Sequence, residues 1–529
     1  MSSCVAVPSG GFAARNEETY YSSRRPTGTM SDTGPRPTEA EAALPDPATA
    51  DDVVYDPSLE WLRERARPEE TKTEFGSAAH VSDQRSRRAD RTKNAVDDVF
   101  RQADYDRLED ALVAARSREM VCLDRRVGRH PDHSYVCRYY VPVEHSRIAL
   151  AVARLFEPAP AGTEPEFLTV QLPDHEEPAV RVLPEAGLTA VLGSDYTGEA
   201  KKSFLRLFMF RAKRAGGLGL HAGSKRVRLA TDDGLETVGQ LFLGLSATGK
   251  STLTAHGLRL EDPEDAVMLQ DDVCALLPDG AVAGSEGNGL YVKTIGLDRE
   301  EQPALYDAAT HGSAVLENVA VAEDGAVDFD SDAHTSNARA VIERDHLDSA
   351  AEAVDLDGVD QVFFITRNSL MPPVARLSAA EAAAAFTLGE SIETSAGDPS
   401  RAGESVRVVG TNPFIVGSEG AEGNRFRELV ERLDVEPYVL NTGHVGTENV
   451  DVEISVTILR ELARGTVTWT DDETTGLTVP ADVPGLYLER FDVAAVDDHE
   501  RRLRELRAER RAYLASFDDL DEEVVDAVY

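Results

Sequence analysis

Short apolar runs separated by polar or glycine-containing turns follow one another along most of the 529 residues. Runs of this length between turn residues predict buried β-strands. In the first half of the chain they are Tyr135 to Val141, Ala149 to Phe156, Leu168 to Leu172, Val180 to Leu183 and Leu188 to Leu192. In the second half they are Val238 to Leu243, Ala266 to Leu269, Val315 to Val321 and Val362 to Ile365.

Helical patterns lie before and between these runs. The alanine-rich run from Ala379 to Phe386 predicts a short helix. The arginine-rich segment from Glu500 to Phe517 has the pattern of an amphipathic helix with a solvated face. Strands that alternate with helices predict an α/β fold.

The composition of the chain divides it into three regions. Residues 1 to about 95 are rich in Pro, Ser, Thr, Gly and charge, so we expect a mostly disordered N-terminal extension there. A chain of this length exceeds one compact core, and a glycine-rich stretch from Gly216 to Ser224 indicates the passage between two domains. We therefore predict an N-terminal α/β domain at residues 96–225 and a C-terminal domain at residues 226–529.

The net charge is −40, from 95 Asp and Glu against 55 Lys and Arg. Such a surface argues against nucleic acid or an anionic membrane as a partner. The acidic residues are spread along the whole chain and 41% of the residues are hydrophobic, which favours a folded, salt-adapted protein over a disordered one. Only eight lysines occur, so each one is a candidate for a chemical role.

Apolar runs and cysteines bear on the compartment. No apolar run reaches the roughly 18 residues that a membrane span requires. The four cysteines, Cys4, Cys122, Cys137 and Cys274, lack CxxC spacing, which fits a reducing compartment. We expect a cytoplasmic protein that is a monomer or a small homo-oligomer.

The most informative stretch is GLSATGKS, from Gly244 to Ser251. An apolar run leads into it and a helix-like segment follows, which is the context of a phosphate-binding P-loop. Its small residues let backbone N–H groups face phosphates, Lys250 can reach the β- and γ-phosphates, and the Ser251 hydroxyl can hold Mg²⁺. An ordinary glycine turn is the alternative, and the coincidence of strand, loop and helix start favours the nucleotide site.

Two carboxylates, Asp271 and Asp272, follow the apolar run Ala266 to Leu269. At a strand end after a P-loop they can hold the metal of a nucleotide. In so acidic a chain the alternative is an ordinary acidic loop. Their place after the next strand beyond the P-loop favours the metal role.

Adjacent lysines, Lys201 and Lys202, precede His221 by about one helix length. Such lysines are normally solvated, and a lone histidine is normally structural. Two of eight lysines lie here, however, and an amine whose pKa a neighbouring charge lowers can ligate a divalent cation. Arg129 and Arg339 are weaker candidates, since a guanidinium can clamp a carboxylate with two hydrogen bonds.

In order and spacing, these pieces resemble ATP-dependent phosphoenolpyruvate carboxykinase over roughly residues 120 to 450. The family's GRSP and YAGEMKKS segments are similar to residues 128–131 and 196–203, and its MHCSAN segment to the surroundings of His221. Its GLSGTGKTT loop and GDD segment correspond to residues 244–252 and 270–272. Its YAKTI, LENV and DFDDGSKTENTR segments correspond to residues 291–295, 316–319 and 328–339.

This resemblance implies an enzyme of gluconeogenesis that converts oxaloacetate and ATP into phosphoenolpyruvate, ADP and CO₂. It implies a two-domain carboxykinase-like α/β fold, with the P-loop in the C-terminal domain and the active site in the interdomain cleft. The implied cofactors are ATP or ADP, Mn²⁺ and Mg²⁺. Together with the charge, it suggests a halophilic source.

Each matched residue acquires an expected role through the resemblance. The expected ligands of Mn²⁺ are Lys202, His221 and Asp272, and Ser251 and the nucleotide phosphates would hold Mg²⁺. Oxaloacetate or phosphoenolpyruvate would contact Arg129, Tyr196, Lys202 and Arg339. The expected catalytic residues are Lys202, His221, Lys250 and Arg339, with Lys250 neutralising the transferred phosphoryl group. The expected nucleotide contacts are Gly244, Leu245, Ser246, Ala247, Thr248, Gly249, Lys250, Ser251, Thr252, Lys293 and Glu317.

Residues 441–450 depart from the family, which has NTGWNGTGKR there. The Arg near the adenine is absent at Val450, where Arg460 is a candidate replacement, and Thr457 matches the family's Thr only after a one-residue shift. In the P-loop, Ala247 adds a methyl group in place of a glycine.

Two other classes of protein are the alternatives. Another P-loop phosphotransferase would explain the loop and Asp272, but not Arg129, the paired lysines and His221 at these intervals. A non-catalytic nucleotide-binding regulatory protein would explain the altered segment before Val450. It predicts a damaged metal site, whereas Lys202, His221 and Asp272 are all present.

Overall fold

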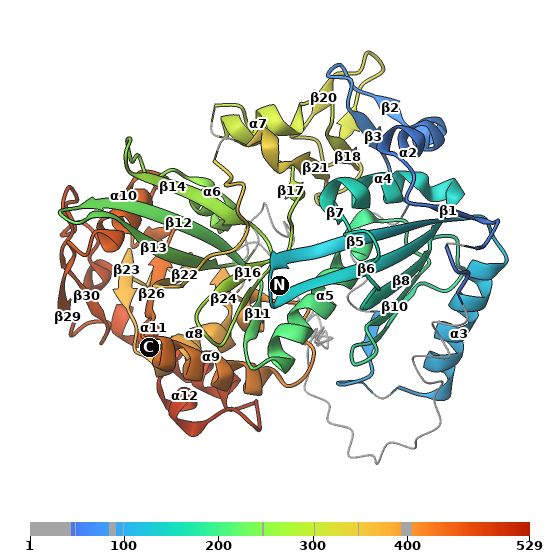
Figure 1. Ribbon diagram of the computed structural model, residues 1–529. Helices are drawn as coiled ribbons and strands as arrows, with labels where there is room; N and C mark the ends of the chain where they lie inside the picture. Colours follow the sequence, from blue (N-terminus) through green and yellow to red (C-terminus); the bar gives the residue numbers. More distant parts are fainter. Residues whose placement is uncertain are drawn as a thin grey trace, which may run out of the picture.

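The computed structural model describes residues 44–529, without residues 48, 84–90, 99, 246–247, 301, 348 and 393–404. Two eight-stranded sheets and a five-stranded sheet are its largest elements (Figure 1). Helices accompany each of them. The mixed α/β class that the sequence predicts is therefore confirmed.

The first eight-stranded sheet is built from the N-terminal part of the chain. In spatial order its strands are β1 (Val53–Tyr55), β5 (Met120–His130), β6 (His133–Pro142), β8 (Phe167–Leu172), β10 (Leu188–Leu192), β9 (Ala179–Leu183) and β4 (Thr92–Asn94), with β7 (Glu157–Pro158) paired to β5. The helices packed against it are α3 (Gln102–Arg116), α4 (Ser146–Leu155) and α5 (Thr197–Arg214).

Both faces of this sheet are buried. Along β5, Met120 and Cys122 belong to the hydrophobic cluster that includes α3, while Val121 and Leu123 belong to the cluster of α4 and α5. A strand covered on both sides consists of continuous apolar residues rather than alternating ones. This explains why these strands are visible in the sequence as apolar runs.

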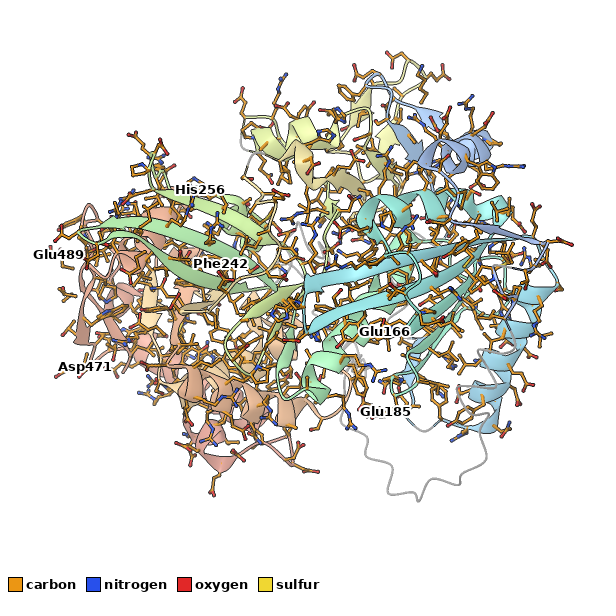
Figure 2. The ribbon with its side chains drawn as sticks, in the orientation of Figure 1. Glu166, Glu185, Phe242, His256, Asp471 and Glu489 are labelled. Atoms are coloured by element: carbon orange, nitrogen blue, oxygen red, sulfur yellow. The ribbon has the colours of Figure 1, made fainter. Side chains whose placement is uncertain are left out.

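The second eight-stranded sheet contains the strand before the P-loop. Its order is β14 (Asp265–Gln270), β12 (Ala222–Thr231), β13 (Gly234–Leu243), β22 (Gln361–Thr366), β26 (Glu436–Asn441), β23 (Val374–Arg376), β30 (Thr478–Asp482) and β29 (Thr468–Asp471). Its helices are α6 (Lys250–Ala255), α8 (Ala379–Leu388), α9 (Glu419–Leu433), α10 (Val452–Ala463), α11 (His499–Leu514) and α12 (Glu522–Asp526). Phe242 lies inside this part of the molecule and is fully buried (Figure 2).

The five-stranded sheet lies at the top of Figure 1. Its order is β17 (Gly289–Lys293), β21 (Arg339–Glu343), β18 (Val315–Glu317), β3 (Ala78–His80) and β2 (Thr71–Lys72), and α7 (Pro303–Ala309) and α2 (Leu59–Ala66) lie close by. A three-stranded sheet combines β11 (Leu218–Leu220), β15 (Cys274–Leu276) and β16 (Val282–Gly284).

The smaller elements complete the described chain. The two-stranded pairs are β19 (Ala320–Val321) with β20 (Val327–Asp328), β24 (Glu390–Ile392) with β25 (Ser405–Arg407), and β27 (His444–Val445) with β28 (Glu448–Asn449). Short 3₁₀ turns lie at Arg67–Glu69, Val143–His145, Arg344–His346, Val409–Thr411 and Val493–Ala495. Of the helices in the described ranges, none has the length and apolar character that crossing a membrane requires.

One predicted strand is wrong, because the run from Ala149 to Phe156 forms most of helix α4. Nearly every residue of α4 is buried, since α2, α5, β5 and β21 all pack against it. Between Arg147 and Arg154 the helix has six consecutive apolar residues, and so short an apolar run cannot be distinguished from a buried strand by pattern alone.

The expectation of disorder is wrong for residues 53–83 and 91–94, which contain short strands and helix α2. β1 pairs with β5 in parallel, and β3 pairs in parallel with β18, more than 200 residues further along the chain. These short strands are stabilised by pairing with distant strands, and their own sequences have no apolar pattern that would predict them. Residues 1–43 lie outside the described residues, and the domain division near residue 225 stays a prediction.

Candidate active site

The P-loop, His221 and Asp272 meet at one edge of the second eight-stranded sheet because of the strand directions. β13, β22 and β26 are parallel, and β12 is antiparallel to both β13 and β14. The carboxyl ends of β14, β13, β22 and β26 therefore share an edge with the amino end of β12. Asp272 follows β14, His221 precedes β12, the P-loop follows β13, and Arg367 and Thr442 follow β22 and β26.

The P-loop connects β13 to α6 with a close-packed backbone. Gly249 has a φ of 96°, a left-handed conformation that favours glycine. A Cβ atom on Gly244 would lie 2.6 Å from Thr248 Oγ1, so a side chain does not fit there. Thr248 also closes the loop by donating from Oγ1 to the Leu245 carbonyl at 2.8 Å. Ser246 and Ala247 lie outside the described residues, so their roles stay predictions.

His221, Asp272 and Lys201 form a cluster beside the P-loop. His221 Nε2 lies 2.9 Å from Asp272 Oδ1, and Lys201 Nζ donates to Asp272 Oδ2 at 2.6 Å. Burial opposes ionisation of Asp272, but the charges of Lys201, His221 and Lys250 hold its pKa well below the usual range. Lys250, the first residue of α6, is thus close enough to act on this carboxylate.

The tautomer of His221 is set by the backbone. Its Nδ1 lies 2.5 Å from the Thr411 carbonyl oxygen, which can only accept a hydrogen bond. Nδ1 therefore carries a proton, so Nε2, which faces the Asp272 carboxylate, is the ring nitrogen that a bound cation would take in place of its contact with that carboxylate. A histidine held in this way is suited to bind a metal through Nε2.

Lys202 lies near this cluster, but its hydrogen bond is to Glu199, whereas Lys201 bonds to Asp272. Lys202 donates to Glu199 Oε1 at 2.9 Å, and its ammonium lies 6.0 Å from the ring centroid of Phe414. The His221 ring also packs against Phe414, with centroids 6.4 Å apart. The assignment of Lys202 as a metal ligand stays a prediction.

Glu286 is a member of the cluster that the sequence analysis missed. Its Oε1 lies 3.0 Å from Lys201 Nζ, and its side chain is fully buried. Burial raises the pKa of Glu286 to about 7, against the opposing charge of Lys201. Burial alone would lower the pKa of Lys201, but Asp272 and Glu286 outweigh it and raise the pKa. One acid among 95 gives no signal in the sequence.

Three candidates form one row across the five-stranded sheet. Arg339 on β21 pairs in register with Lys293 on β17 and with Glu317 on β18. Arg339 donates to Asn337 Oδ1 at 2.9 Å, and its guanidinium lies 5.6 Å from the ring centroid of Tyr291. The sequence predicts these three residues separately, and the pairing of the strands brings them together.

Tyr196 and Glu317 connect this sheet to α5. The Tyr196 hydroxyl accepts a hydrogen bond from Asn337 Nδ2 at 3.0 Å. Glu317 accepts from the Thr197 N–H at 3.1 Å and from the Tyr291 hydroxyl. Burial raises the pKa of Glu317. The hydrogen-bond partners of Glu317 therefore lie beside Tyr196 and Arg339 and not in the P-loop.

Arg129 lies near the end of β5, where the pairing with β6 is irregular. Its donors are engaged by the protein: Nε bonds to Glu157 at 3.0 Å, Nη2 to the Gly287 carbonyl at 2.8 Å and Nη1 to the Glu352 carbonyl at 2.6 Å. Gly287 is the neighbour of Glu286, so Arg129 is connected to the cluster through that segment. To bind the substrate as predicted, Arg129 would have to give up some of these protein acceptors for the substrate.

The segment of residues 441–450 lies against the P-loop, since Thr442 Oγ1 donates to the Thr248 carbonyl at 2.7 Å. Arg460, the candidate replacement for the absent Arg, bonds to its neighbour Glu461 at 2.9 Å. Thr457 donates to the Glu453 carbonyl within α10. The described residues contain no group of three or more His, Cys, Asp and Glu side chains arranged as a metal site.

A sheet edge that combines a P-loop sequence with a half-buried cluster of Lys, His and Asp is typical of an enzyme that uses a nucleotide. The family model described as phosphoenolpyruvate carboxykinase matches residues 70–489. The chain is 35% identical over 483 residues to phosphoenolpyruvate carboxykinase (ATP) of Aeropyrum pernix, covering 89% of this chain and 96% of that protein. It is 28% identical over 407 residues to phosphoenolpyruvate carboxykinase (ATP) of Azorhizobium caulinodans, covering 72% of each. The chain belongs to the ATP-type phosphoenolpyruvate carboxykinase family.

Proposed function

We propose that this chain converts oxaloacetate and ATP into phosphoenolpyruvate, ADP and CO₂. The observation that carries the proposal is the cluster of His221, Asp272 and Lys201 next to the P-loop, in a member of a family whose relatives are named for this activity. The other P-loop phosphotransferases and the regulatory protein are not favoured, since the family match covers most of the chain.

We assign the substrate-binding role to Tyr196, Arg339, Lys202 and Arg129. The support is that Tyr196 and Arg339 both bond to Asn337, and that the Lys202 ammonium lies 5.3 Å from the Tyr196 ring centroid. A guanidinium and an ammonium gathered in this way suit a dicarboxylate such as oxaloacetate. Arg129 has the least support, because its donors are engaged by protein acceptors.

We assign a Mn²⁺ site to His221, Asp272 and Lys202, and a Mg²⁺ site to Ser251 and the nucleotide phosphates. The donor set fits a divalent cation, because a carboxylate oxygen and a ring nitrogen converge within 2.9 Å and the ring presents Nε2. A cation bound there supplies positive charge that stabilises an enolate oxygen. Lys202 would have to leave Glu199 to complete the set.

In the proposed reaction, the C–C bond to the departing carboxylate breaks and its electron pair forms an enolate. The enolate oxygen attacks the γ-phosphorus of ATP in line, and the bond to the β-phosphate oxygen breaks to release ADP. The P-loop amides and Lys250 spread the charge of the transferred group. Tyr196 and Arg339 hold the substrate in position for attack.

We further propose that the site lies in a cleft between residues 96–225 and residues 226–529. The support is that Lys201 of α5 bonds to Asp272 after β14, and that Tyr196 bonds to Asn337 before β21. Closure of such a cleft would exclude water from the enolate. A cytoplasmic monomer or small homo-oligomer remains the expected form, with oxaloacetate, phosphoenolpyruvate and CO₂ as its small-molecule partners.

A coupled assay of phosphoenolpyruvate formation from oxaloacetate, with ATP or GTP in high KCl with Mn²⁺, tests the proposal. We expect turnover that depends on both oxaloacetate and nucleotide and that Lys250→Ala nearly abolishes. Phosphorylation without release of CO₂ would indicate another phosphotransferase. Nucleotide binding without turnover would indicate a regulatory protein.

A further inference from the structure

Arg367, directly after β22, differs from the arginines around it. No hydrogen bond or ion pair joins its guanidinium to any of the residues that the structure describes, and its Nε is buried. By contrast, Arg376 on β23 donates to Glu436 at 2.8 Å. A buried N–H without an acceptor costs free energy, so a bound acceptor is its expected partner.

The backbone of Arg367 lies between the P-loop and the segment after β26. On one side, a Cβ atom on Gly244 would lie 3.1 Å from Cβ of Ile365, two residues before Arg367. On the other side, a Cβ atom on Gly443 would lie 3.1 Å from Cα of Arg367. Thr442, next to Gly443, bonds to the P-loop. Arg367 therefore flanks the phosphate-binding loop directly.

The order of the strands fixes the side on which Arg367 lies. His221 and Asp272, at β12 and β14, are on one side of the P-loop, and Arg367, at β22, is on the other. The terminal phosphate has to face the metal cluster for transfer. The α- and β-phosphates then extend toward β22.

We propose that Arg367 binds the α- and β-phosphates of the nucleotide, an inference that rests on the proposed function for the identity of the nucleotide. A guanidinium matches phosphate oxygens with two parallel hydrogen bonds. Phosphates are the acceptors that the P-loop brings to this edge. Arg367 thus supplies a cation on the side of the nucleotide where the chain has Val450 instead of Arg.

Titration calorimetry with Mg·ADP and Mg·GDP at constant high KCl tests this inference. Arg367→Ala should lower the affinity for both nucleotides about tenfold, since one charge-assisted phosphate contact is lost. Arg367→Lys should recover part of the affinity because it keeps the charge. Arg376→Ala, a matched arginine of the same sheet, should bind like the wild type. In turnover, the KM for ATP should rise while the KM for oxaloacetate and kcat stay within about twofold.

Unchanged affinity for both nucleotides in a variant with a wild-type melting temperature would overturn the inference. Loss of ADP affinity alone would also overturn it, because the contact would then be to the base. If Arg367→Ala has a lowered melting temperature, the nucleotide affinities of Arg367→Gln and Arg367→Lys are compared with those of the wild type instead. Binding is measured without turnover, so a chain that binds ADP through Arg367 but forms no phosphoenolpyruvate contradicts only the proposed function.

Discussion

Adjacent lysines at the start of α5 have different surroundings and therefore different roles. The side chain of Lys201 is 3% exposed and lies between two carboxylates, Asp272 and Glu286. The side chain of Lys202 is 15% exposed, bonds to Glu199 and faces aromatic rings. Lys201 is the shared cation of the buried Glu286 and the half-buried Asp272, whereas Lys202 is placed to exchange its partner for a ligand.

Replacing each lysine by Met should separate these roles. Lys201→Met leaves the buried Glu286 carboxylate without its counter-ion and removes one cation from Asp272, and removing one partner of a buried pair costs about 3–5 kcal/mol. It should lower the melting temperature strongly. Lys202→Met should keep the melting temperature within a few degrees and lower kcat by more than about 100-fold, on the order expected for a metal-site residue. Equal melting temperatures for the two variants would contradict the division of roles.

At the scale of the elements, a buried lysine of β12 binds the carboxyl end of α6, the helix that follows the P-loop. Lys225 on β12 is fully buried and donates to the carbonyls of Leu253 at 2.5 Å and His256 at 2.6 Å. Its ammonium lies 5.5 Å from the ring centroid of Phe242. Its N–H groups hold the last carbonyls of α6, so Lys225 fixes the helix whose amino end receives the phosphates.

The pH dependence of stability should report on Lys225. Burial lowers the pKa of Lys225 from 10.5 to about 7, so between these values the unfolded chain binds more protons than the native state. The contribution of Lys225 to stability should therefore rise with pH across this window. The difference in the free energy of unfolding between wild type and Lys225→Met should grow from pH 7 to pH 10. For Lys72→Met, at an exposed position, this difference should stay constant with pH. A constant difference for Lys225→Met as well would contradict the lowered pKa of Lys225.

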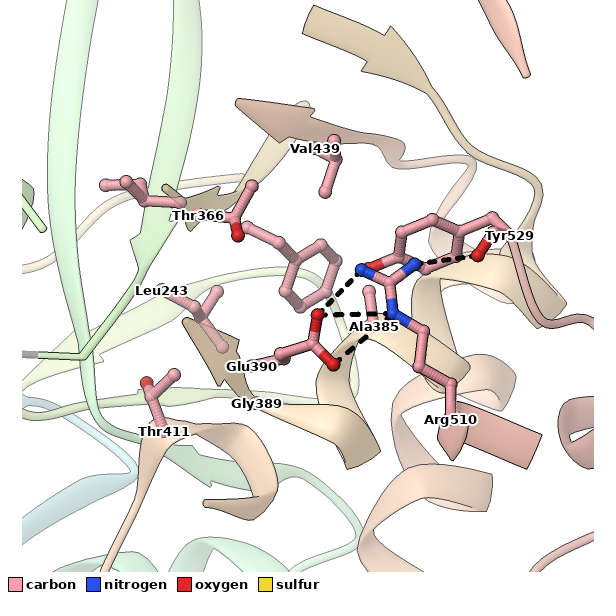
Figure 3. A pocket seen from close by; sticks show the side chains of 11 residues that line it. Leu243, Thr366, Ala385, Gly389, Glu390, Thr411, Val439, Arg510 and Tyr529 are labelled. Atoms are coloured by element: carbon pink, nitrogen blue, oxygen red, sulfur yellow. Dashed lines mark hydrogen bonds and ion pairs between the residues drawn. The ribbon is translucent and has the colours of Figure 1, made fainter. Parts of the chain in front are cut away.

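A second buried charge group joins three elements near the C-terminal residue (Figure 3). Arg510 of α11 donates to Glu390 of β24 at 2.8 Å and to the Tyr529 carbonyl at 2.7 Å. Arg407 of β25 bonds to the same carboxylate at 2.7 Å. Burial alone would raise the pKa of Glu390, but Arg510 and Arg407 lower it to about 2.

Glu390→Gln should show what this group contributes. It leaves two arginines without their shared counter-ion, so chemical denaturation at pH 7 should show a loss of about 3–5 kcal/mol. The stabilisation by Glu390 is present above its ordinary pKa of 4.5 and is lost as the pH falls toward 2. The gap to the wild type should therefore shrink between pH 5 and pH 3. A gap independent of pH would contradict the ionised pair.

At the scale of the whole molecule, the sequence predicts local units well and their long-range pairings poorly. The P-loop unit follows from residues adjacent in the chain, and its strand and helix are confirmed. Strand β3 could not be predicted, because its partner β18 lies far away in the sequence. Helix α4 was misread because a short continuous apolar run fits a buried strand as well as a buried helix.

The candidate site shows the same division. His221, Asp272 and the lysines were visible because histidine and lysine are rare in this chain and because their spacing matches a family. Glu286 and Arg367 were not, since acids and arginines are abundant; Glu286 is distinguished by its burial, and Arg367 by a guanidinium without a hydrogen-bond partner among the described residues. Composition marks the rare residue types, and the fold is needed to identify functional members of the common ones.

The acidic surface leads to the last prediction. Acidic side chains such as Glu185, Asp471 and Glu489 lie exposed at the periphery of the molecule in Figure 2, and the net charge is −40. Repulsion among like charges opposes the compact state, and salt screens it, with a Debye length that falls from roughly 30 Å at 0.01 M to roughly 3 Å at 1 M. The melting temperature should therefore rise with KCl, most steeply below about 1 M, where the screening length changes most.

Calorimetry across a KCl titration, with sucrose at equal osmolality as the control, tests this screening effect. Sucrose is excluded from protein surfaces and stabilises the folded state without screening charge. Only KCl should produce the steep rise at low concentration. A melting temperature that stays flat or falls with KCl, or that sucrose raises equally, would mean that repulsion among the acidic side chains does not limit the stability of the fold and that the salt adaptation inferred from composition is wrong.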